Sequence, residues 1–191
     1  MVEAQSNPTV EGRLEPRGGR LSEAEFQRRA LRIKLVLTDS DGVLTDGGVY
    51  YSASGEELRR FSVRDGMGVE RLRGAAVETA IITREKGAAV RKRAEKLKMR
   101  YVYLGVRDKL AHLPVVYSQT GLGLDQMGYI GDDVNDQEII QAINPEGLTG
   151  APADAFPSVR HLVHYVSSAR GGDGAFRDFA EWILALRGQQ I

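Results

Sequence analysis

Residues Ile33 to Asp46 read I-K-L-V-L-T-D-S-D-G-V-L-T-D, a short apolar run that ends in two aspartates, Asp39 and Asp41. A run that is almost continuously apolar is typical of a parallel strand covered on both faces of a sheet. Gly42 then allows the chain to turn away. We therefore expect a buried strand that delivers both carboxylates to one edge of a sheet.

The aspartate pair has two explanations. Two carboxylates at one strand end repel each other unless a cation or a shared proton relieves them, which indicates a metal site or acid–base chemistry. A solvated turn is the alternative, because Asp and Gly are ordinary turn residues. The pair alone therefore does not assign a function.

Composition narrows the classes of function. With 191 residues, of which 42% are hydrophobic and 27% charged, one globular domain is expected. Basic and acidic residues number 26 each, so no overall field attracts nucleic acid or an anionic membrane. The chain has no cysteine, which excludes disulfides and thiolate chemistry and leaves oxygen ligands for a hard cation such as Mg²⁺.

The N-terminal region differs from the rest of the chain. Residues 1–20 are rich in Gly, Pro, Arg and Glu without periodicity, so residues 1–30 are expected to form a disordered tail and a lead-in helix at 21–31. No apolar run approaches the ~20 residues that span a bilayer, and the N-terminus lacks the apolar core of a secretory signal. We expect a cytoplasmic protein.

Strand and helix patterns alternate after the aspartate pair. Residues 49–51 and 57–63 flank a glycine-containing turn and predict a β-hairpin that projects beside the site as a flap. A helix at 65–73, entered through Asp65, leads to a strand at 77–82 that ends in Thr83. Further helices are expected at 85–97, 108–120 and 175–186, and further strands at 101–104, 127–130 and within 147–166.

This order predicts an α/β fold with a doubly wound, Rossmann-like parallel sheet and right-handed crossovers. Ligands of such sheets bind beyond the carboxyl ends of the strands. Asp39, Asp41, Thr83 and Asp132 each stand at a strand end. We therefore expect them to converge on one crevice.

Four motifs in a fixed order resemble those of the haloacid dehalogenase superfamily of phosphatases. They are D-x-D-G-x-x-T at residues 39–45, the strand-end Thr83, Lys109 before a helix, and G-D-D-x-x-D at residues 131–136. The resemblance covers roughly residues 33–187 and implies a phosphatase domain over residues 31–191.

The residue types also suit phosphoryl transfer on chemical grounds. An Asp carboxylate can attack phosphorus and divide one difficult displacement into two easier steps, and Asp39 is the candidate nucleophile. Asp41 is expected to protonate the leaving alkoxide and then deprotonate the attacking water. The Thr83 hydroxyl and the Lys109 ammonium would bind the phosphoryl oxygens, where negative charge accumulates.

Mg²⁺ is the expected cofactor. Its expected ligands are the Asp39 carboxylate, the Asp41 main-chain carbonyl and Asp132, with waters and phosphate completing an octahedron. Asp133 and Asp136 are expected to hydrogen-bond to these ligands and orient them.

Other interpretations stay open. Taken singly, Thr83 is an ordinary strand-end hydroxyl, Lys109 a surface lysine and residues 132–133 a helix cap. A phospho-acceptor signalling domain of the receiver type also combines an acidic pocket, a strand-end Thr and a Lys on a doubly wound sheet, but it lacks the D-x-D pair and the late G-D-D. A non-catalytic relative is a further alternative.

The sequence has no room for the cap domain that this superfamily usually carries, so the crevice would be open in a monomer. Small capless members assemble as tetramers, and three motifs resemble the branch that acts on 8- or 9-phosphates of 2-keto-3-deoxy sugar acids. These motifs are T-D-x-D-G-V-L-T-D-G at 38–47, F-S-V-R-D-G at 61–66 and R-G-G-D-G-A-F-R-D-F at 170–179. We expect a homotetramer with contacts through the hairpin, and a mobile segment at 170–174 that reaches a nearby site.

The second motif departs from this branch. The octulosonate enzymes typically show T-G-R or S-G-R, whereas this chain reads Thr83-Arg84-Glu85-Lys86. Together with R-K-R-A-E-K-L-K at 91–98, the motif resembles the 2-keto-3-deoxy-nononate 9-phosphate phosphatases more closely. The expected substrate is therefore a nonulosonate 9-phosphate of the KDN or sialate type, with 3-deoxy-manno-octulosonate 8-phosphate as the alternative.

Six residues are candidates for binding the sugar acid. Glu85 would accept hydrogen bonds from the hydroxyls of the sugar. Arg93 and Lys96 lie on one face of the expected helix and would bind the carboxylate of the sugar acid across a subunit interface. A solvated surface helix explains those two cations equally well. The candidates are Arg64, Gly66, Arg84, Glu85, Arg93 and Lys96.

Overall fold

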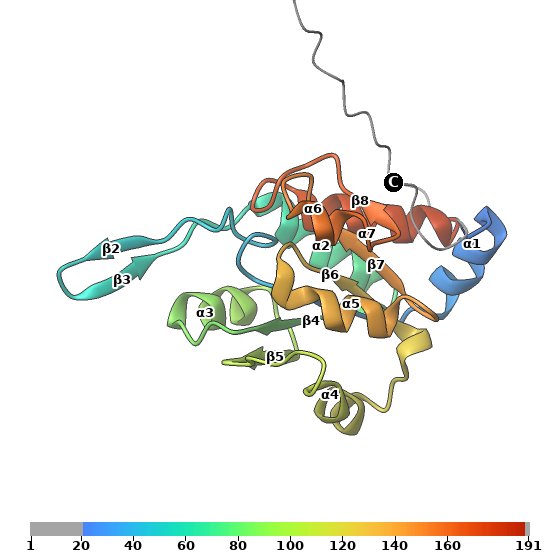
Figure 1. The fold of residues 1–191 in the computed structure, drawn as a ribbon, viewed down its shortest axis with the longest axis horizontal. Coiled ribbons are helices and arrows are strands. Elements are labelled where there is room, and N and C mark those ends of the chain that lie inside the picture. Colours follow the sequence, from blue (N-terminus) through green and yellow to red (C-terminus); the bar gives the residue numbers. More distant parts are fainter. Residues whose placement is uncertain (1–20, 190–191) are drawn as a thin grey trace, which may run out of the picture.

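The computed structural model describes residues 21–189, so the expected tail at 1–20 lies outside the described residues. A six-stranded sheet has the order β5-β4-β1-β6-β7-β8, and every neighbouring pair is parallel (Figure 1). The strands are β1 Leu35–Thr38, β4 Glu78–Thr83, β5 Tyr101–Leu104, β6 Met127–Ile130, β7 Leu148–Ala151 and β8 Tyr165–Val166. The predicted doubly wound α/β fold is confirmed.

Helices cover both faces of this sheet. The helices α1 Glu23–Arg32, α2 Val63–Gly74, α3 Ala88–Lys96 and α7 Ala175–Leu186 contribute to one core, and α4 Leu113–Thr120, α5 Gln137–Ile143 and α6 Pro157–Arg160 to the other. In β1, Val36 points into the first core while Leu35 and Leu37 point into the second. Burial of each such side chain contributes roughly 1.5–3 kcal/mol, which explains why the strand is apolar on both faces.

A β-hairpin of β2 Tyr50–Ser52 and β3 Gly55–Leu58 projects from the body of the molecule (Figure 1). Its predicted second strand was longer, at 57–63. The strand ends at Leu58 because the next side chain, Arg59, turns inward to two carboxylates. Tyr50 and Tyr51 are 62% and 73% exposed, so these two side chains are not packed on their own domain, whereas Phe61, in the expected second strand, packs against the core.

The helix α2 begins earlier than predicted. Ser62, not Asp65, is its N-cap, and the Ser62 hydroxyl accepts a hydrogen bond from the Arg64 amide. Asp65 is buried and accepts hydrogen bonds from the amides of Gly174 and Arg177 at the start of α7. This carboxylate therefore joins α2 to α7 rather than capping its own helix.

Two other helices begin later than predicted, while α7 has the predicted bounds. The expected helix at 85–97 begins at Ala88, because the Glu85 side chain is held by Arg59 and residues 84–87 form a loop. The expected helix at 108–120 begins at Leu113, followed by Pro114, whose fixed backbone favours a first turn. Two short 3-10 helices, η1 Leu124–Gln126 and η2 Val134–Asp136, flank β6.

The edge of the sheet where the strands end is open. Only β2, β3 and α3 occupy the segments in which a cap domain would be inserted, residues 46–62 and 84–100. The structure thus leaves the carboxyl edge of the sheet accessible from one side.

Among the described residues, no helix combines the length and apolar character needed to cross a membrane.

Candidate active site

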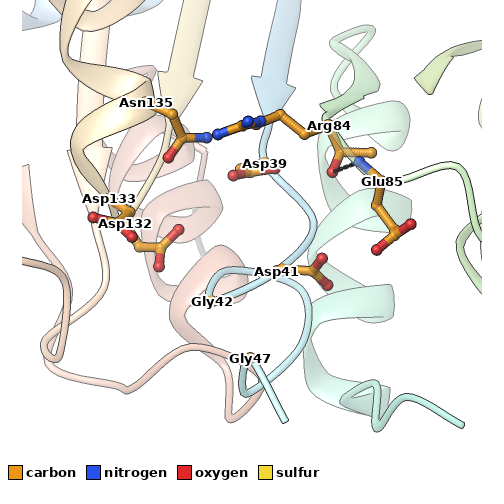
Figure 2. A pocket seen from close by; sticks show the side chains of 10 residues that line it. Asp39, Asp41, Gly42, Gly47, Arg84, Glu85, Asp132, Asp133 and Asn135 are labelled. Carbon is orange, nitrogen blue, oxygen red and sulfur yellow. Dashed lines mark hydrogen bonds between the residues drawn. The ribbon is translucent and has the colours of Figure 1, made fainter. Parts of the chain in front are cut away.

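The carboxyl edge of the sheet brings the predicted strand-end residues together. Asp39 directly follows β1, Thr83 ends β4, and Asp132 lies two residues beyond β6. They surround a cavity of about 390 Å³ (Figure 2). Its lining residues are Asp39, Asp41, Gly42, Gly47, Thr83, Arg84, Glu85, Asp132, Asp133 and Asn135.

A buried lysine connects two of the acidic residues. The Lys109 ammonium lies 2.7 Å from Asp39 Oδ2 and 2.5 Å from Asp136 Oδ1, and the lysine side chain has no exposed surface. Tyr129 donates a hydrogen bond of 2.6 Å to the same Asp136 oxygen. Lys109 is therefore not a surface lysine, and its charge is compensated inside the protein.

The pKa values of this group reflect burial. Burial alone lowers the pKa of the Lys109 ammonium, but the two adjacent carboxylates outweigh it and raise the pKa. Burial raises the pKa of Asp39 to about 6, with Lys109 opposing the rise and Asp136 adding to it. Burial raises the pKa of Asp132 to about 8, with further contributions from Asp136 and Asp39. The raised pKa values of Asp39 and Asp132 thus indicate that the site has too little positive charge to stabilise all of its ionised carboxylates.

An acidic cluster of suitable size for a metal ion lies here. Asp39, Asp132 and Asp136 each offer a carboxylate oxygen, and these oxygens lie within 4.8 Å of one another. The Oδ1 atom of Asp132 is buried and has no hydrogen-bond partner among residues 21–189. A hard divalent cation prefers such oxygen donors, and it would satisfy this orphaned atom. The residues present therefore fit a metal ion.

Gly42 makes the close approach of the cluster to β1 feasible. Its φ of +82° is in the left-handed region that favours glycine, and a Cβ atom there would lie 2.0 Å from Asp132 Oδ2. A side chain at position 42 would therefore displace Asp132, so the position of Asp132 depends on glycine in the turn after the aspartate pair.

The two acidic residues expected to support the metal ligands have different partners. Asp136 Oδ2 accepts hydrogen bonds from the amides of Asp132 and Asp133, so it fixes the loop after β6. The Asp133 carboxylate accepts from the amide of Val134 and caps η2. Asp136 also belongs to the acidic cluster, whereas Asp133 lines the cavity wall.

Asp41 is held by a residue that the sequence reasoning missed. Arg59, at the base of the hairpin, forms ion pairs with the carboxylates of Asp41 and Glu85. Its side chain is only 4% exposed. Thr45 also donates a hydrogen bond to Asp41, at 3.2 Å. In the sequence, Arg59 and Arg60 look like a solvated charge pair, and no local pattern indicates this contact.

The remaining candidates divide into two groups. Arg84 and Glu85 line the cavity, and the buried Thr83 hydroxyl accepts a hydrogen bond from the Glu85 amide. The other four are outside the cavity lining of this single chain, and their predicted contact with substrate across an interface stays a prediction. They are Arg64, Gly66, Arg93 and Lys96.

Arg93 and Gly66 have a structural role within the chain. Arg93 donates a 2.7 Å hydrogen bond to the Ser62 carbonyl and lies over the Phe61 ring. A Cβ atom on Gly66 would lie 2.7 Å from the Arg93 guanidinium. Arg64 and Lys96 are exposed, on α2 and α3 respectively.

Two glycines of the segment at 170–174 pack against the loop that follows β1. Gly171 and Gly172 are buried, and the Gly172 amide donates a hydrogen bond of 2.9 Å to the Val43 carbonyl. The expectation that this segment reaches a nearby site concerns the assembly of subunits and stays a prediction. Within the chain, the segment supports the loop that carries the aspartate pair.

The fold and the site define a phosphatase of the haloacid dehalogenase superfamily, with no cap domain among residues 21–189. No family model matches the chain. It is, however, 37% identical over 164 residues to the 3-deoxy-D-manno-octulosonate 8-phosphate phosphatase KdsC of Haemophilus influenzae, spanning 86% of this chain and 89% of that protein. KdsC of Escherichia coli is 34% identical over 166 residues, 87% of each chain. The chain belongs to the KdsC family of phosphatases.

Solved structures agree with this assignment. The phosphatase from Moraxella catarrhalis, in complex with magnesium, phosphate and KDO, is 32% identical with a TM-score of 0.80, covering 86% of this chain and 92% of that one. The cobalt-bound Haemophilus influenzae enzyme is 37% identical with a TM-score of 0.77, covering 84% and 92%. These names support the octulosonate alternative, and the expected preference for a nonulosonate is not supported.

Proposed function

We propose that this chain hydrolyses the phosphomonoester of 3-deoxy-D-manno-octulosonate 8-phosphate in a Mg²⁺-dependent reaction that passes through an aspartyl phosphate on Asp39. The observation that carries the reaction type is the buried Asp39 carboxylate, which lines the cavity, contacts Lys109 and belongs to the acidic cluster. The similarity to octulosonate phosphatases over more than four fifths of the chain supports the substrate.

Asp39 is oriented as a nucleophile by its neighbours. Its Oδ1 accepts a 2.6 Å hydrogen bond from the Ser40 amide, and its Oδ2 lies against Lys109. One carboxylate oxygen attacks phosphorus, and the bond from phosphorus to the sugar oxygen breaks. Fixing the carboxylate before the substrate binds removes part of the entropic cost of this step.

We assign the two proton transfers of the reaction to Asp41. It would donate a proton to the leaving alkoxide and then take one from the water that attacks the aspartyl phosphate, which releases inorganic phosphate and regenerates Asp39. Arg59 and Thr45 hold the Asp41 carboxylate in the cavity wall, so its position does not depend on the substrate. Arg59 is thus a positioning residue.

Asp39, the main-chain carbonyl of Asp41 and Asp132 would hold Mg²⁺, and Asp136 fixes the loop that carries Asp132. When bound, the ion would neutralise charge on the phosphoryl oxygens and on the crowded carboxylates. The magnesium in the Moraxella catarrhalis relative supports this choice of cation.

A phosphate-release assay with Mg²⁺ tests the proposal. It compares octulosonate 8-phosphate with nonulosonate 9-phosphates and with generic sugar phosphates. We expect the highest kcat/KM for octulosonate 8-phosphate, no turnover by Asp39→Asn and no turnover in excess chelator. Asp125→Asn is the control, because this residue precedes β6 at the opposite edge of the sheet. A higher kcat/KM for a nonulosonate, or turnover by Asp39→Asn, would reject the proposal.

The assembly stays a prediction. The open cavity and the exposed Tyr50 and Tyr51 support a homotetramer in which neighbouring subunits cover the site. A cytoplasmic location is likewise expected from the sequence alone. Light scattering at assay concentration tests the tetramer, and a fully active monomer would contradict it, together with the predicted contacts of Arg93 and Lys96 across the interface.

A further inference from the structure

The cavity contains an imbalance of charge that the residues assigned so far do not correct. Five of its lining residues are acidic, and Arg84 is the only cationic residue among the ten that line it. Two other cations contact the lining carboxylates and are already paired: Lys109 contacts Asp39 and Asp136, and Arg59 contacts Asp41 and Glu85. A phosphorylated sugar acid nevertheless brings two oxyanionic groups into this space.

Arg84 extends into the cavity from the end of β4. In Figure 2 its side chain reaches across the cavity above Asp39 and toward Asn135, which lies in η2 after β6. Among the side chains that the structure describes, none forms a hydrogen bond or an ion pair with the Arg84 guanidinium or the Asn135 carboxamide. Two groups that can donate hydrogen bonds therefore converge over the nucleophile.

Glu85, the next residue, does not cancel this charge. Its carboxylate accepts hydrogen bonds from Arg59 and from the Lys86 amide. The two neighbouring residues thus have different roles, because Glu85 joins the hairpin to the cavity wall while Arg84 faces the open space.

We propose that Arg84 is an oxyanion-binding residue of this site, and that it receives one anionic group of the substrate together with Asn135. The proposal rests on the proposed function and assigns a residue to it. A guanidinium presents several N–H donors in one plane and binds phosphate or carboxylate oxygens in a bidentate manner. Its position above Asp39 favours the phosphoryl oxygens, and the sugar carboxylate is the second source of the same chemistry.

Binding of orthophosphate provides a test that does not need turnover. Calorimetry with the Mg²⁺-loaded protein would compare wild type with Arg84→Ala, Arg84→Lys and Arg91→Ala. Arg91 is an exposed arginine of α3 that is absent from the cavity lining, so it controls for the loss of one surface charge. We expect about a 10-fold or larger rise in Kd for Arg84→Ala, because a charge-assisted hydrogen bond is lost. Arg84→Lys is expected to recover part of the affinity, and Arg91→Ala to match wild type.

Kinetics then distinguish the two anionic groups. If Arg84 binds the phosphoryl oxygens, Arg84→Ala lowers kcat/KM by a similar factor for octulosonate 8-phosphate and for p-nitrophenyl phosphate, which has no carboxylate. If Arg84 binds the carboxylate, Arg84→Ala lowers kcat/KM for octulosonate 8-phosphate but not for p-nitrophenyl phosphate, and it weakens inhibition by free octulosonate. Changes below twofold in all of these quantities would overturn the proposal.

The test separates this proposal from the function on which it rests. If wild type does not hydrolyse octulosonate 8-phosphate and Arg84→Ala still weakens orthophosphate binding, the proposed substrate is wrong and the assignment of Arg84 holds. Because Arg84 is exposed, its substitution is not expected to affect folding, and a thermal midpoint equal to that of Arg91→Ala would verify this.

Discussion

A Cβ atom on Gly171 would lie 1.9 Å from the carbonyl oxygen of Gly42. Two segments about 130 residues apart in the sequence therefore pack backbone against backbone, at a distance that only glycine permits. One segment is the loop that follows β1 and carries the aspartate pair, and the other leads into α7. Figure 1 shows α7 on the same side of the sheet as α2. The last helix thus supports the candidate catalytic loop.

Gly171→Ala should impair both stability and activity. The added methyl group meets backbone rather than a flexible side chain, so the loop carrying Asp41 has to move. We expect a loss of about 1–3 kcal/mol in the free energy of unfolding, as for overpacking of a core, and a lower kcat. Denaturant unfolding and phosphate release measure the two effects.

Gly74→Ala is the matched control for this substitution. Nothing lies within 4 Å of a Cβ atom at Gly74, and the residue ends α2. The change is expected to be neutral or to stabilise the helix by up to about 1 kcal/mol. Equal behaviour of the two variants would show that the contact between Gly171 and Gly42 does not constrain the loop.

Lys109→Met should destabilise the fold as well as the reaction. It leaves Asp39 and Asp136 buried without their shared cation, and breaking a buried ion pair in this way costs about 3–5 kcal/mol. Because protonation of a carboxyl relieves the repulsion, the loss should be smaller at pH 5 than at pH 8. Lys92→Met, which removes an exposed lysine of α3, is the control and should change little. A loss that does not depend on pH would contradict this explanation.

Local patterns are sufficient for the strands of the parallel sheet and for the residues at their ends. β1 is apolar because both of its faces are buried, and the chemistry follows at once in Asp39, so pattern and site lie next to each other in the sequence. α7 was predicted with the correct bounds, because its apolar residues recur at helical spacing after a glycine.

Contacts between distant side chains could not be predicted in this way. The ion pairs of Arg59 with Asp41 and Glu85 span 18 and 26 residues, and they depend on how the hairpin leaves the sheet. Asp65 looked like a helix cap, but Ser62 caps α2 and frees Asp65 to bind the start of α7. In both cases several residues could make the same contact on local grounds, and tertiary packing determines which of them does.

Glu85→Gln should act through Arg59 rather than on the substrate directly. The substitution removes the charge of one of the two carboxylates that Arg59 contacts, so it weakens the link that fixes Arg59 beside Asp41. Because Arg59 positions Asp41, we expect a lower kcat, with KM changed less than kcat. The ratio of kcat/KM between the octulosonate and nonulosonate substrates should stay within about twofold, because such a ratio reports differences in substrate contact. A large change in that ratio would instead assign Glu85 to the substrate, as the sequence predicted.

Asp132→Asn should stabilise the protein without metal and abolish its response to Mg²⁺. The pKa of Asp132 is about 8 in the folded chain and near 3.8 in the unfolded chain, mainly because the group is buried among other carboxylates. Its contribution to stability is therefore fully present below about pH 4 and is lost as the pH rises to about 8. The asparagine cannot ionise, so the variant should have a higher thermal midpoint than wild type at pH 8 in chelator and a similar one at pH 4.

Mg²⁺ should reverse this order at pH 8. A cation that binds the folded state raises the thermal midpoint of wild type, and the variant lacks a ligand for it. Asp125→Asn, at the other edge of the sheet, should respond to Mg²⁺ as wild type does. Thermal unfolding at both pH values, with chelator and with Mg²⁺, measures all four conditions. If Mg²⁺ stabilises Asp132→Asn as much as wild type, Asp132 is not a ligand, and the unpaired Asp132 Oδ1 needs another explanation.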